Sequence, residues 1–431
     1  MTSFFNYIYD INLLLIAGLG LGLNYYKPSD LKKSNIKKII FLSVTGAFML
    51  FIFVSRYGIG FDYFNYYTLL NQCKTFSFLE LLTYKGPVEP GFAVLLKLIS
   101  FITNDIVIMY LILGIIMLLV LNIYIYKYST EPWVSVYLFV GFGFMFGVMN
   151  LFRQYFVAIV FLFAIKYIQN KNFCMFLLVT LICASIHKSA LIILPVYFIA
   201  RLDINWKTLT FFGSLTLLAY IFCDYAINFI TQYIYTDYNL ETGELKRFMG
   251  GMPWQFVIVP FIYCLTAVLM KNKLLKKDPG NIVLINFSIY TLILWILMTK
   301  HLLLERASNF FYISSILLGA QLVSCLNPDQ NIKQRLDEIK NLISQMKKNN
   351  NKGKALESKN HELKKIQEEY SESKAYYVTA IVSILILGFL NQVFATSHGN
   401  HAVFPYKSIF TRERDTNREN SIKQISEQQN D

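Results

Sequence analysis

The sequence predicts an all-α integral membrane protein, built as a polytopic bundle of about 12 transmembrane helices. Of its 431 residues, 55% are apolar and only 16% are charged, whereas about 25% of residues are charged in a typical soluble domain. The apolar residues also come in runs separated by short polar stretches. Because a helix needs about 20 apolar residues to cross roughly 30 Å of hydrocarbon, these runs have the length that a bilayer requires.

The first apolar run has no basic segment before it and no small-residue cleavage site after it. We therefore expect a retained first helix rather than a signal peptide. A shorter apolar stretch, Phe92 to Ile102, carries Lys97 and would span only about 20 Å as a helix. We expect it to form a re-entrant or interfacial segment on the outer face. The predicted transmembrane helices lie near residues 5–24, 39–55, 105–126, 132–149, 152–169, 173–186, 189–200, 208–224, 254–270, 281–299, 303–325 and 376–395.

The basic residues predict the orientation of the bundle. If the short stretch does not cross, the lysine clusters all fall on one face, and loops rich in lysine and arginine stay in the cytoplasm. Both termini are then expected outside. The net charge of +13 is interpreted as this topology signal, so no nucleic-acid partner is expected. The clusters are Lys27 to Lys38, Lys127, Lys166 and Lys171, Arg201 and Lys207, Lys271 to Lys277, and the stretch 327–375.

One segment differs in composition from the rest. From Ile332 to Met346 apolar residues recur at heptad spacing, which is typical of helices that pack against each other. The NNNKGK stretch then interrupts the helix, so we expect a charged cytoplasmic helical hairpin. The tail after Phe410 has almost nothing to bury and is expected to be disordered. The predicted domains are a transmembrane catalytic bundle (1–326, with outer loops 56–104 and 225–253), the hairpin (327–375), the last transmembrane helix (376–395) and an extracytoplasmic, partly disordered tail (396–431).

Unusual polar residues concentrate on the predicted outer face. An arginine near mid-membrane costs about 2.5–3.5 kcal/mol, so such residues are expensive to keep without a partner. Arginines that converge on one face would form a strong oxyanion site, because a guanidinium group binds phosphate oxygens with a planar fork. The residues are Arg56, Asp62, Tyr63 and Glu89 in the first outer loop, Asn150, Arg153 and Gln154 in a second turn, His187 in a third, Arg247 in the loop 225–253, and Arg306 in a last turn.

Each of these residues also has a structural interpretation. Arg56 and Arg306 would snorkel to the membrane interface, His187 would pack as a hydrogen-bonded histidine, and Asp62 would cap a turn. Their coincidence on one face favours the functional interpretation.

Metal and nucleotide sites are not predicted. The chain has no DxD, HExxH or P-loop motif, and its six cysteines form no CxxC pair. We therefore expect a metal-independent mechanism without a cofactor.

Six segments of the chain resemble the EpsG family, a Wzy-like group of bacterial polysaccharide polymerases. They occur in the order and at the spacing of that family and are spread over the whole chain. The heptad hairpin departs from the compact family pattern. The segments are SRYGIGFDYFNYY (55–67), EPGFAVLLKLIS (89–100), NLFRQYFVAIVFLFAIKYIQNKNF (150–173), ASIHKSALIILPVYF (184–198), ERASNFF (305–311) and PYKSIF (405–410).

The resemblance implies an enzyme of O-antigen, capsule or exopolysaccharide synthesis in a bacterial cytoplasmic membrane. It would transfer a growing glycan from undecaprenyl diphosphate to the next lipid-linked repeat unit on the outer face. The departing diphosphate needs electrostatic stabilisation, which arginines supply. The sugar hydroxyl needs a base, and Asp62, Glu89 and His187 are the candidates. The expected substrate-binding residues are Arg56, Tyr63, Asn150, Arg153, Gln154, Arg247 and Arg306.

The resemblance also implies partners. These are the undecaprenyl-diphosphate-linked oligosaccharide and membrane lipid, with a chain-length regulator and a flippase as further candidates.

Other functions stay open at this point. A glycosyltransferase with a lipid monophosphate sugar donor would use the acidic first outer loop equally well. A ligase that passes finished glycan to another acceptor would share the arginines. A flippase or exporter of lipid-linked oligosaccharide would show two related halves and charges near the midplane, and the chain has no internal repeat.

Overall fold

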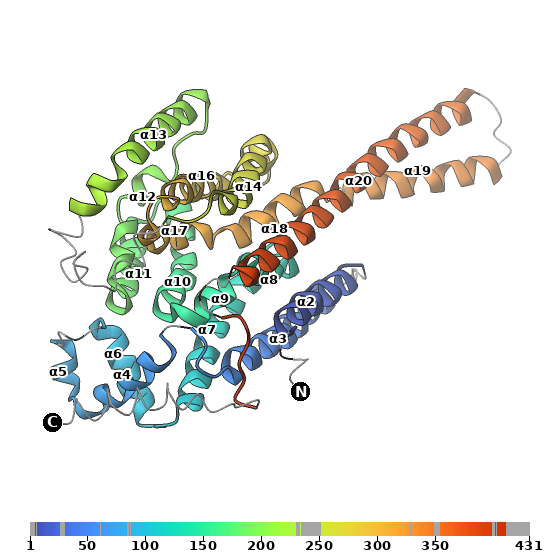
Figure 1. Cartoon of the computed structure of the whole chain (residues 1–431). Helices are drawn as coiled ribbons and strands as arrows, with labels where there is room; N and C mark the ends of the chain where they lie inside the picture. Colours follow the sequence, from blue (N-terminus) through green and yellow to red (C-terminus); the bar gives the residue numbers. More distant parts are fainter. Residues whose placement is uncertain are drawn as a thin grey trace.

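The computed structural model describes residues 5, 7–25, 31–60, 62–83, 86, 88–229, 233, 251–327, 330–348, 354–398, 401 and 403–410. Within these ranges the regular secondary structure is entirely helical (Figure 1). The described strand-like contact is an isolated antiparallel bridge between Arg56 and Ser408. The predicted all-α fold class is confirmed.

Six described helices are long and apolar enough to cross a membrane, and three bent helix pairs raise the number to as many as nine. The multi-pass membrane character is therefore confirmed. The six are α3 (Leu31–Ser55), α7 (Ile106–Tyr128), α10 (Phe152–Gln169), α13 (Trp206–Phe229), α16 (Asn281–Met298) and α20 (Lys354–Ser397). The bent pairs are α8 (Pro132–Gly141) with α9 (Phe144–Asn150), η5 and α14 (Trp254–Val257, Ile258–Leu269) with α15 (Lys271–Lys277), and η6 and α17 (Leu302–Leu304, Glu305–Tyr312) with α18 (Ser315–Leu326).

The predicted number of about 12 spans is not confirmed, because the other apolar helices are short. Helix α11 (Phe173–Ile186) has 14 residues and would reach only about 21 Å. The predicted outer loop 56–104 is largely helical, and a re-entrant or interfacial position of its apolar segment stays a prediction. The remaining helices are α2 (Ile8–Tyr25), α4 (Tyr63–Thr75), α5 (Phe78–Leu82), α6 (Pro90–Ser100), η1 (Lys188–Ile193) and α12 (Val196–Ile199).

The bundle is built around α8 and α10. Every residue of α8 is buried, since α2, α18 and α20 all pack against it. A buried serine joins two of these helices: the Ser135 hydroxyl donates to the Ile316 carbonyl of α18 at 2.8 Å. Hydrogen bonding of this kind satisfies a polar group where no water is available.

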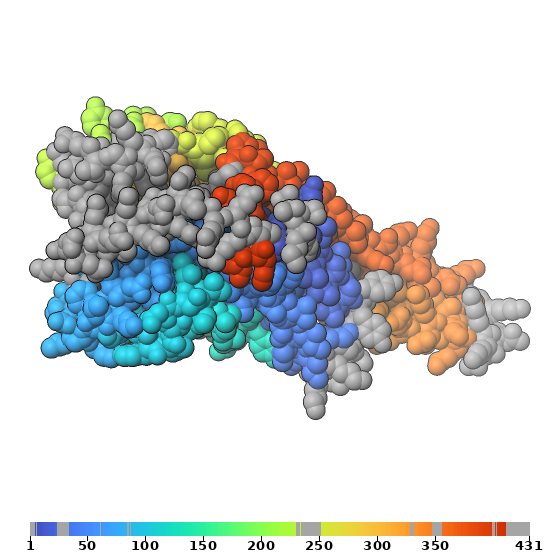
Figure 2. Space-filling view, turned by 60° about the horizontal axis from the view of Figure 1, so that its bottom comes forward, coloured from blue at the N-terminus to red at the C-terminus, as the bar shows by residue number. Residues whose placement is uncertain are grey.

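Helices α19 (Gln330–Lys348) and α20 lie side by side and project from the bundle (Figures 1 and 2). Their contact is the predicted apolar seam, in which Leu336, Ile339 and Ile343 of α19 pack on Ile366 of α20. Helix α20 continues without a break through residues 375 and 376, so the boundary expected there is not a helix end. The cytoplasmic position of this pair stays a prediction.

After α20 the chain returns to the first helices, and Figure 2 shows this part (red) against the N-terminal helices (blue). The Tyr9 hydroxyl donates to the Val403 carbonyl at 2.9 Å. The backbone N–H of Tyr57 donates to the Lys407 carbonyl at 2.9 Å. Residues near the two ends of the chain therefore surround the C-terminal end of α3. The predicted tail after Phe410 and most of the predicted loop 225–253 lie outside the described residues.

Candidate active site

Glu89 holds together the residues that the sequence placed in three separate outer turns. Its Oε2 lies 2.6 Å from Nη1 of Arg153, and its Oε1 accepts the backbone N–H of Lys188 at 2.9 Å. The Nδ1 atom of His187 lies 3.3 Å from the same Oε1. The side chains of Arg153, Glu89 and His187 are 20%, 14% and 12% exposed, so the group is largely shielded from solvent.

The start of α6 approaches the end of α11 closely enough for this contact because residue 91 is glycine. A Cβ atom at Gly91 would lie 2.5 Å from Oγ and 2.6 Å from the carbonyl oxygen of Ser185, which no real side chain tolerates. Glu89 is the residue before Pro90 and forms the N-cap of α6, whereas His187 is the C-cap of α11. The EPG sequence thus lets the carboxylate reach His187.

Asp62 is linked to Arg153 through the hydroxyl of Tyr66. It precedes α4 as its N-cap, and its Oδ2 accepts the Tyr66 hydroxyl at 3.4 Å. The same hydroxyl accepts the backbone N–H of Arg153 at 3.4 Å. Gly60 makes the preceding turn possible, because its φ is +87° and a Cβ there would lie 2.5 Å from the Met149 carbonyl oxygen. We call Asp62, Glu89, Arg153 and His187 the polar cluster.

Three helices begin at the polar cluster, and a fourth begins next to Arg306. Asp62 precedes α4, Glu89 precedes α6, Arg153 lies in the first turn of α10, and Arg306 lies in the first turn of α17. Helix α10 starts here because Leu151 leaves helical geometry, with φ −99° and ψ 55°. The N-terminal end of a helix carries partial positive charge and unpaired N–H groups, so it favours anions. The cluster therefore combines helix ends with arginines.

Arg306 and Gln154 join the cluster to α17. The Gln154 side chain donates from Nε2 to the Arg306 carbonyl at 2.8 Å. The charge of Arg306 contributes to lowering the pKa of both Asp62 and His187. Arg153 has a buried Nε without a hydrogen-bond partner among the described residues. The Arg153 guanidinium thus keeps one N–H donor unused next to the shielded carboxylate of Glu89.

The pKa values of the two carboxyl groups of the cluster are shifted in opposite directions. Burial raises the pKa of Glu89, but contacts with His187, the Lys188 N–H and the Arg153 charge outweigh it and lower the pKa to about 2. Burial raises the pKa of Asp62 above its ordinary value, and the charges of Arg153 and Arg306 offset this only in part. Burial also lowers the pKa of His187. Two carboxyl groups whose surroundings separate their pKa values are suited to different roles.

A second set of polar side chains adjoins the cluster through α9, α10 and α17. His401 lies with Nε2 3.5 Å from Oε1 of Glu305, and its Nδ1 lies 3.4 Å from Nδ2 of Asn150. The Tyr155 hydroxyl donates to Oδ1 of Asn309 at 3.2 Å and lies 3.4 Å from Oε1 of Glu305. Asn150 is thus a predicted residue that the structure places beside a histidine from the far end of the chain.

Sequence reasoning missed His401, Tyr66 and Tyr155 as members of the site. Tyr66 lies four residues after Asp62 on α4, so helical spacing would have placed it beside that carboxyl group. His401 precedes the segment 405–410, which the resemblance had picked out, but a histidine in a polar tail carries no signal by itself.

Arg56 and Tyr63 belong to a neighbouring group of side chains, which we call the aromatic cage, and Tyr63 directly follows Asp62. Arg56 is 1% exposed, and its guanidinium carbon lies 3.9 Å from the Phe53 ring centre, 4.3 Å from that of Tyr110 and 5.5 Å from that of Tyr63. Its Nη1 donates to the Phe53 carbonyl at 2.9 Å. No carboxylate forms an ion pair with Arg56 in the described part of the chain. Substrate binding by Arg56 and Tyr63 stays a prediction, as does that by Arg247, which lies outside the described residues.

The described residues contain no group of three His, Cys, Asp or Glu side chains that could hold a metal ion. The expectation of a metal-independent mechanism is not tested by this and stays a prediction.

Helices long enough to cross a membrane, with charged side chains gathered at helix ends, define the class: a multi-pass membrane protein with a shielded cluster of charged side chains. The chain belongs to the EpsG family, whose family model matches residues 39–334. The match confirms the resemblance seen in the sequence. It ends within α19, so most of the hairpin and the segment 401–410 lie beyond it. Comparisons with curated proteins and with solved structures find no match.

Proposed function

We propose that this protein is a polysaccharide polymerase. It transfers a growing glycan from undecaprenyl diphosphate to the next lipid-linked repeat unit. Membership of the EpsG family supports a polymerase-type role. The observation that carries the proposal is the polar cluster, in which Arg153 is held by Glu89 at 2.6 Å next to Asp62 and His187.

In the proposed reaction, a hydroxyl oxygen of the acceptor sugar attacks the anomeric carbon of the glycan. A new C–O bond forms while the bond from that carbon to the diphosphate oxygen breaks. The electron pair leaves with the diphosphate, and the hydroxyl proton passes to a base. The atoms balance without an oxidant or a further reactant.

Arg153 and Arg306 stabilise the charge that develops on the leaving diphosphate. They are preorganised, because Glu89 orients Arg153 and the Gln154 side chain binds the Arg306 backbone. A fixed donor in a shielded site stabilises a transition-state charge without reorganisation, and removing one costs about 100- to 1,000-fold in rate.

Asp62 is the proposed base. Glu89 is a poor proton acceptor, since its pKa is lowered to about 2 and its two oxygens already contact Arg153 and Lys188. Burial raises the pKa of Asp62, which strengthens it as a base. His187, with Nδ1 facing Glu89, positions the carboxylate that holds Arg153.

The cluster is proposed to face the outside of a bacterial cytoplasmic membrane. Helix α10 begins at the cluster and ends near Lys166 and Lys171, and the lysine-rich α15 packs against α14, α16 and α18. Loops that carry many lysines stay in the cytoplasm, so the end with the cluster would be the outer one.

The test is the lipid-linked glycan profile of a deletion strain complemented with wild-type protein or with Arg153→Ala. We expect long polymer with the wild type, and single repeat units outside the membrane with the variant. Protein levels in the membrane should be equal. Single units trapped inside would indicate a flippase, and full-length polymer with Arg153→Ala would refute the proposed role of the cluster.

A further inference from the structure

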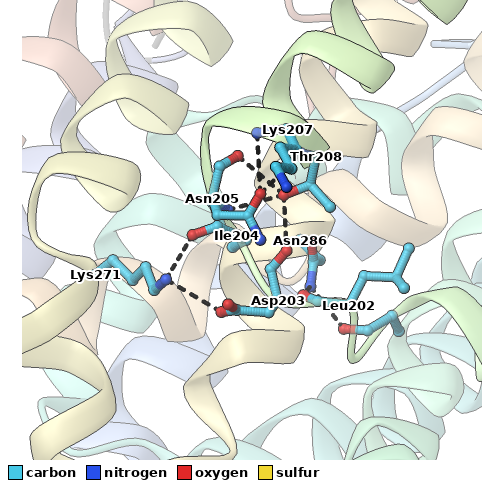
Figure 3. A network of polar contacts seen from close by, with 9 residues as sticks. Leu202, Asp203, Ile204, Asn205, Lys207, Thr208, Lys271 and Asn286 are labelled. Atoms are coloured by element: carbon cyan, nitrogen blue, oxygen red, sulfur yellow. Dashed lines mark hydrogen bonds and ion pairs between the residues drawn. The ribbon is translucent and has the colours of Figure 1, made fainter.

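Helix α13 is attached to the bundle mainly at its two ends. At its N-terminal end, shown in Figure 3, Asn205 accepts the backbone N–H groups of Lys207 and Thr208 at 2.9 and 3.1 Å. The preceding chain is anchored as well, because Nζ of Lys271 lies 3.1 Å from Oδ1 of Asp203 and Asn286 donates to the Leu202 carbonyl at 2.9 Å.

The other attachment is an acidic residue near the C-terminal end of α13. Oδ2 of Asp224 lies 2.9 Å from Nζ of Lys300, and its Oδ1 lies 2.7 Å from Nε2 of His301. Both partners follow the end of α16. The Lys300 ammonium also lies 4.8 Å from the centre of the Tyr220 ring. Two polar contacts therefore hold α13 against α16 from opposite ends.

Between these attachments an apolar groove of about 450 Å³ lies between α13 and α16, beside the contact of the Phe212 ring with the Tyr290 ring at 5.6 Å. This volume lies within the roughly 300–1,000 Å³ typical of ligand pockets. Leu209, Gly213 and Leu217 line one wall, and Ile289 and Ile293 of α16 line the opposite wall. A Cβ atom at Gly213 would have no atom within 4 Å, so the helix offers open space there.

We propose that this groove binds the hydrocarbon chain of a polyprenyl diphosphate. The part of the chain that it covers is the isoprene units nearest the headgroup. This assignment rests on the proposed function, because it names where that substrate's lipid lies. Burying apolar chain against apolar walls is favourable in proportion to the area covered.

The position of the groove joins it to the polar cluster. Its lining includes Tyr220, whose ring lies beneath the Lys300 ammonium. From His301 the short helix η6 leads directly to Glu305 and Arg306 at the start of α17. A chain seated in the groove would thus present its diphosphate at the end where Lys300 and His301 lie, and from there toward Arg306.

The experiment uses full-length protein in phosphatidylcholine nanodiscs. The probe is a polyprenyl diphosphate with a diazirine on an isoprene unit near the headgroup. After irradiation, the labelled peptides are identified by mass spectrometry. We expect label on α13 and α16. In Gly213→Phe the ring would occupy the groove and displace at least two methylene-sized groups, which should reduce labelling about tenfold.

The matched control is Gly18→Phe on α2. A Cβ at Gly18 also has no atom within 4 Å, so the same substitution adds the same bulk elsewhere on the bundle, and labelling should stay at the wild-type level. If Gly213→Phe does not fold, Leu217→Trp takes its place, since Leu217 is 64% exposed and lines the groove.

Three results would overturn the groove assignment: label away from α13 and α16, unchanged labelling in the groove variants, or equal competition by unlabelled polyprenyl diphosphate and phosphatidylglycerol. The last result would mean a site for membrane lipid in general. These outcomes are distinct from failure of the proposed function. If Arg153→Ala blocks polymer but Gly213→Phe labels like the wild type, only the groove is wrong. If wild-type protein labels on the groove while Arg153→Ala still makes polymer, only the role of the cluster is wrong.

Discussion

Two arginines of this protein look equivalent in the sequence and occupy opposite surroundings in the fold. Arg56 lies in the aromatic cage, 1% exposed and beside three rings. Arg153 lies in the polar cluster, 20% exposed and paired with Glu89. The cage surrounds its cation with ring faces and a backbone carbonyl, leaves its Nε without a hydrogen-bond partner among the described residues, and brings no described carboxylate to it. The cluster keeps its cation next to titratable groups and helix ends, which is an arrangement suited to an anionic ligand.

The largest expected effect comes from replacing arginine by lysine at positions 56 and 153. Arg153→Lys should lower polymer formation by about 1,000-fold, because an ammonium cannot reproduce the planar fork on a diphosphate. Arg56→Lys should leave the activity of the folded protein near that of the wild type. The measurement is polymer formed per folded molecule in membranes. Equal losses in both variants would return Arg56 to the substrate site, as the sequence had predicted.

The next effect concerns the assignment of the base. Asp62→Asn should reduce turnover by at least about 100-fold and remove the acid limb of the pH–rate profile. His187→Gln should reduce turnover less and keep that limb, because His187 positions Glu89 in this proposal. Activity must rise with pH through the Asp62 pKa, since only the ionised carboxylate accepts a proton. A lost acid limb in His187→Gln, with the limb intact in Asp62→Asn, would reverse the two roles.

A smaller effect is expected on the stability of the cage. Arg56→Met keeps an apolar side chain of similar length among Phe53, Tyr63 and Tyr110 but removes the cation, at a cost of about 2 kcal/mol. The melting temperature in detergent should fall, whereas polymer formed per folded molecule should stay near the wild-type level. A cage that tolerated Arg56→Met without any loss of stability while polymer disappeared would contradict the structural role.

The last effect is the pH dependence of stability at Glu89. Its folded pKa is about 2, below the ordinary value of 4.5, so the stabilisation is complete above pH 4.5 and is lost as the pH falls toward 2. Acid titration of the melting temperature should show this loss in wild type and in Arg56→Met. In Glu89→Gln it should be absent, because an amide does not titrate.

Much of the site could be predicted because its residues occur in short distinctive strings. Arginine, histidine and glutamate stand out in a chain in which only 16% of residues are charged, and each lies next to a break between apolar runs. The pairing of Glu89 with Arg153 and His187 could not be predicted, since it depends on the close approach at Gly91 and Ser185. His401 was missed for the same reason: its neighbours Glu305 and Asn150 are far from it in the sequence.

By itself the sequence determined the membrane class, the all-helical fold and the EpsG family, because hydrophobic length and local motifs are properties of contiguous residues. Only the tertiary structure decided that Arg56 is enclosed by aromatic rings while Arg153 faces two carboxyl groups. It also decided that an apolar groove forms between α13 and α16, between two polar attachments. The physical reason is that burial and the distance between charges arise from segments far apart in the chain, and these quantities determine what an arginine can bind.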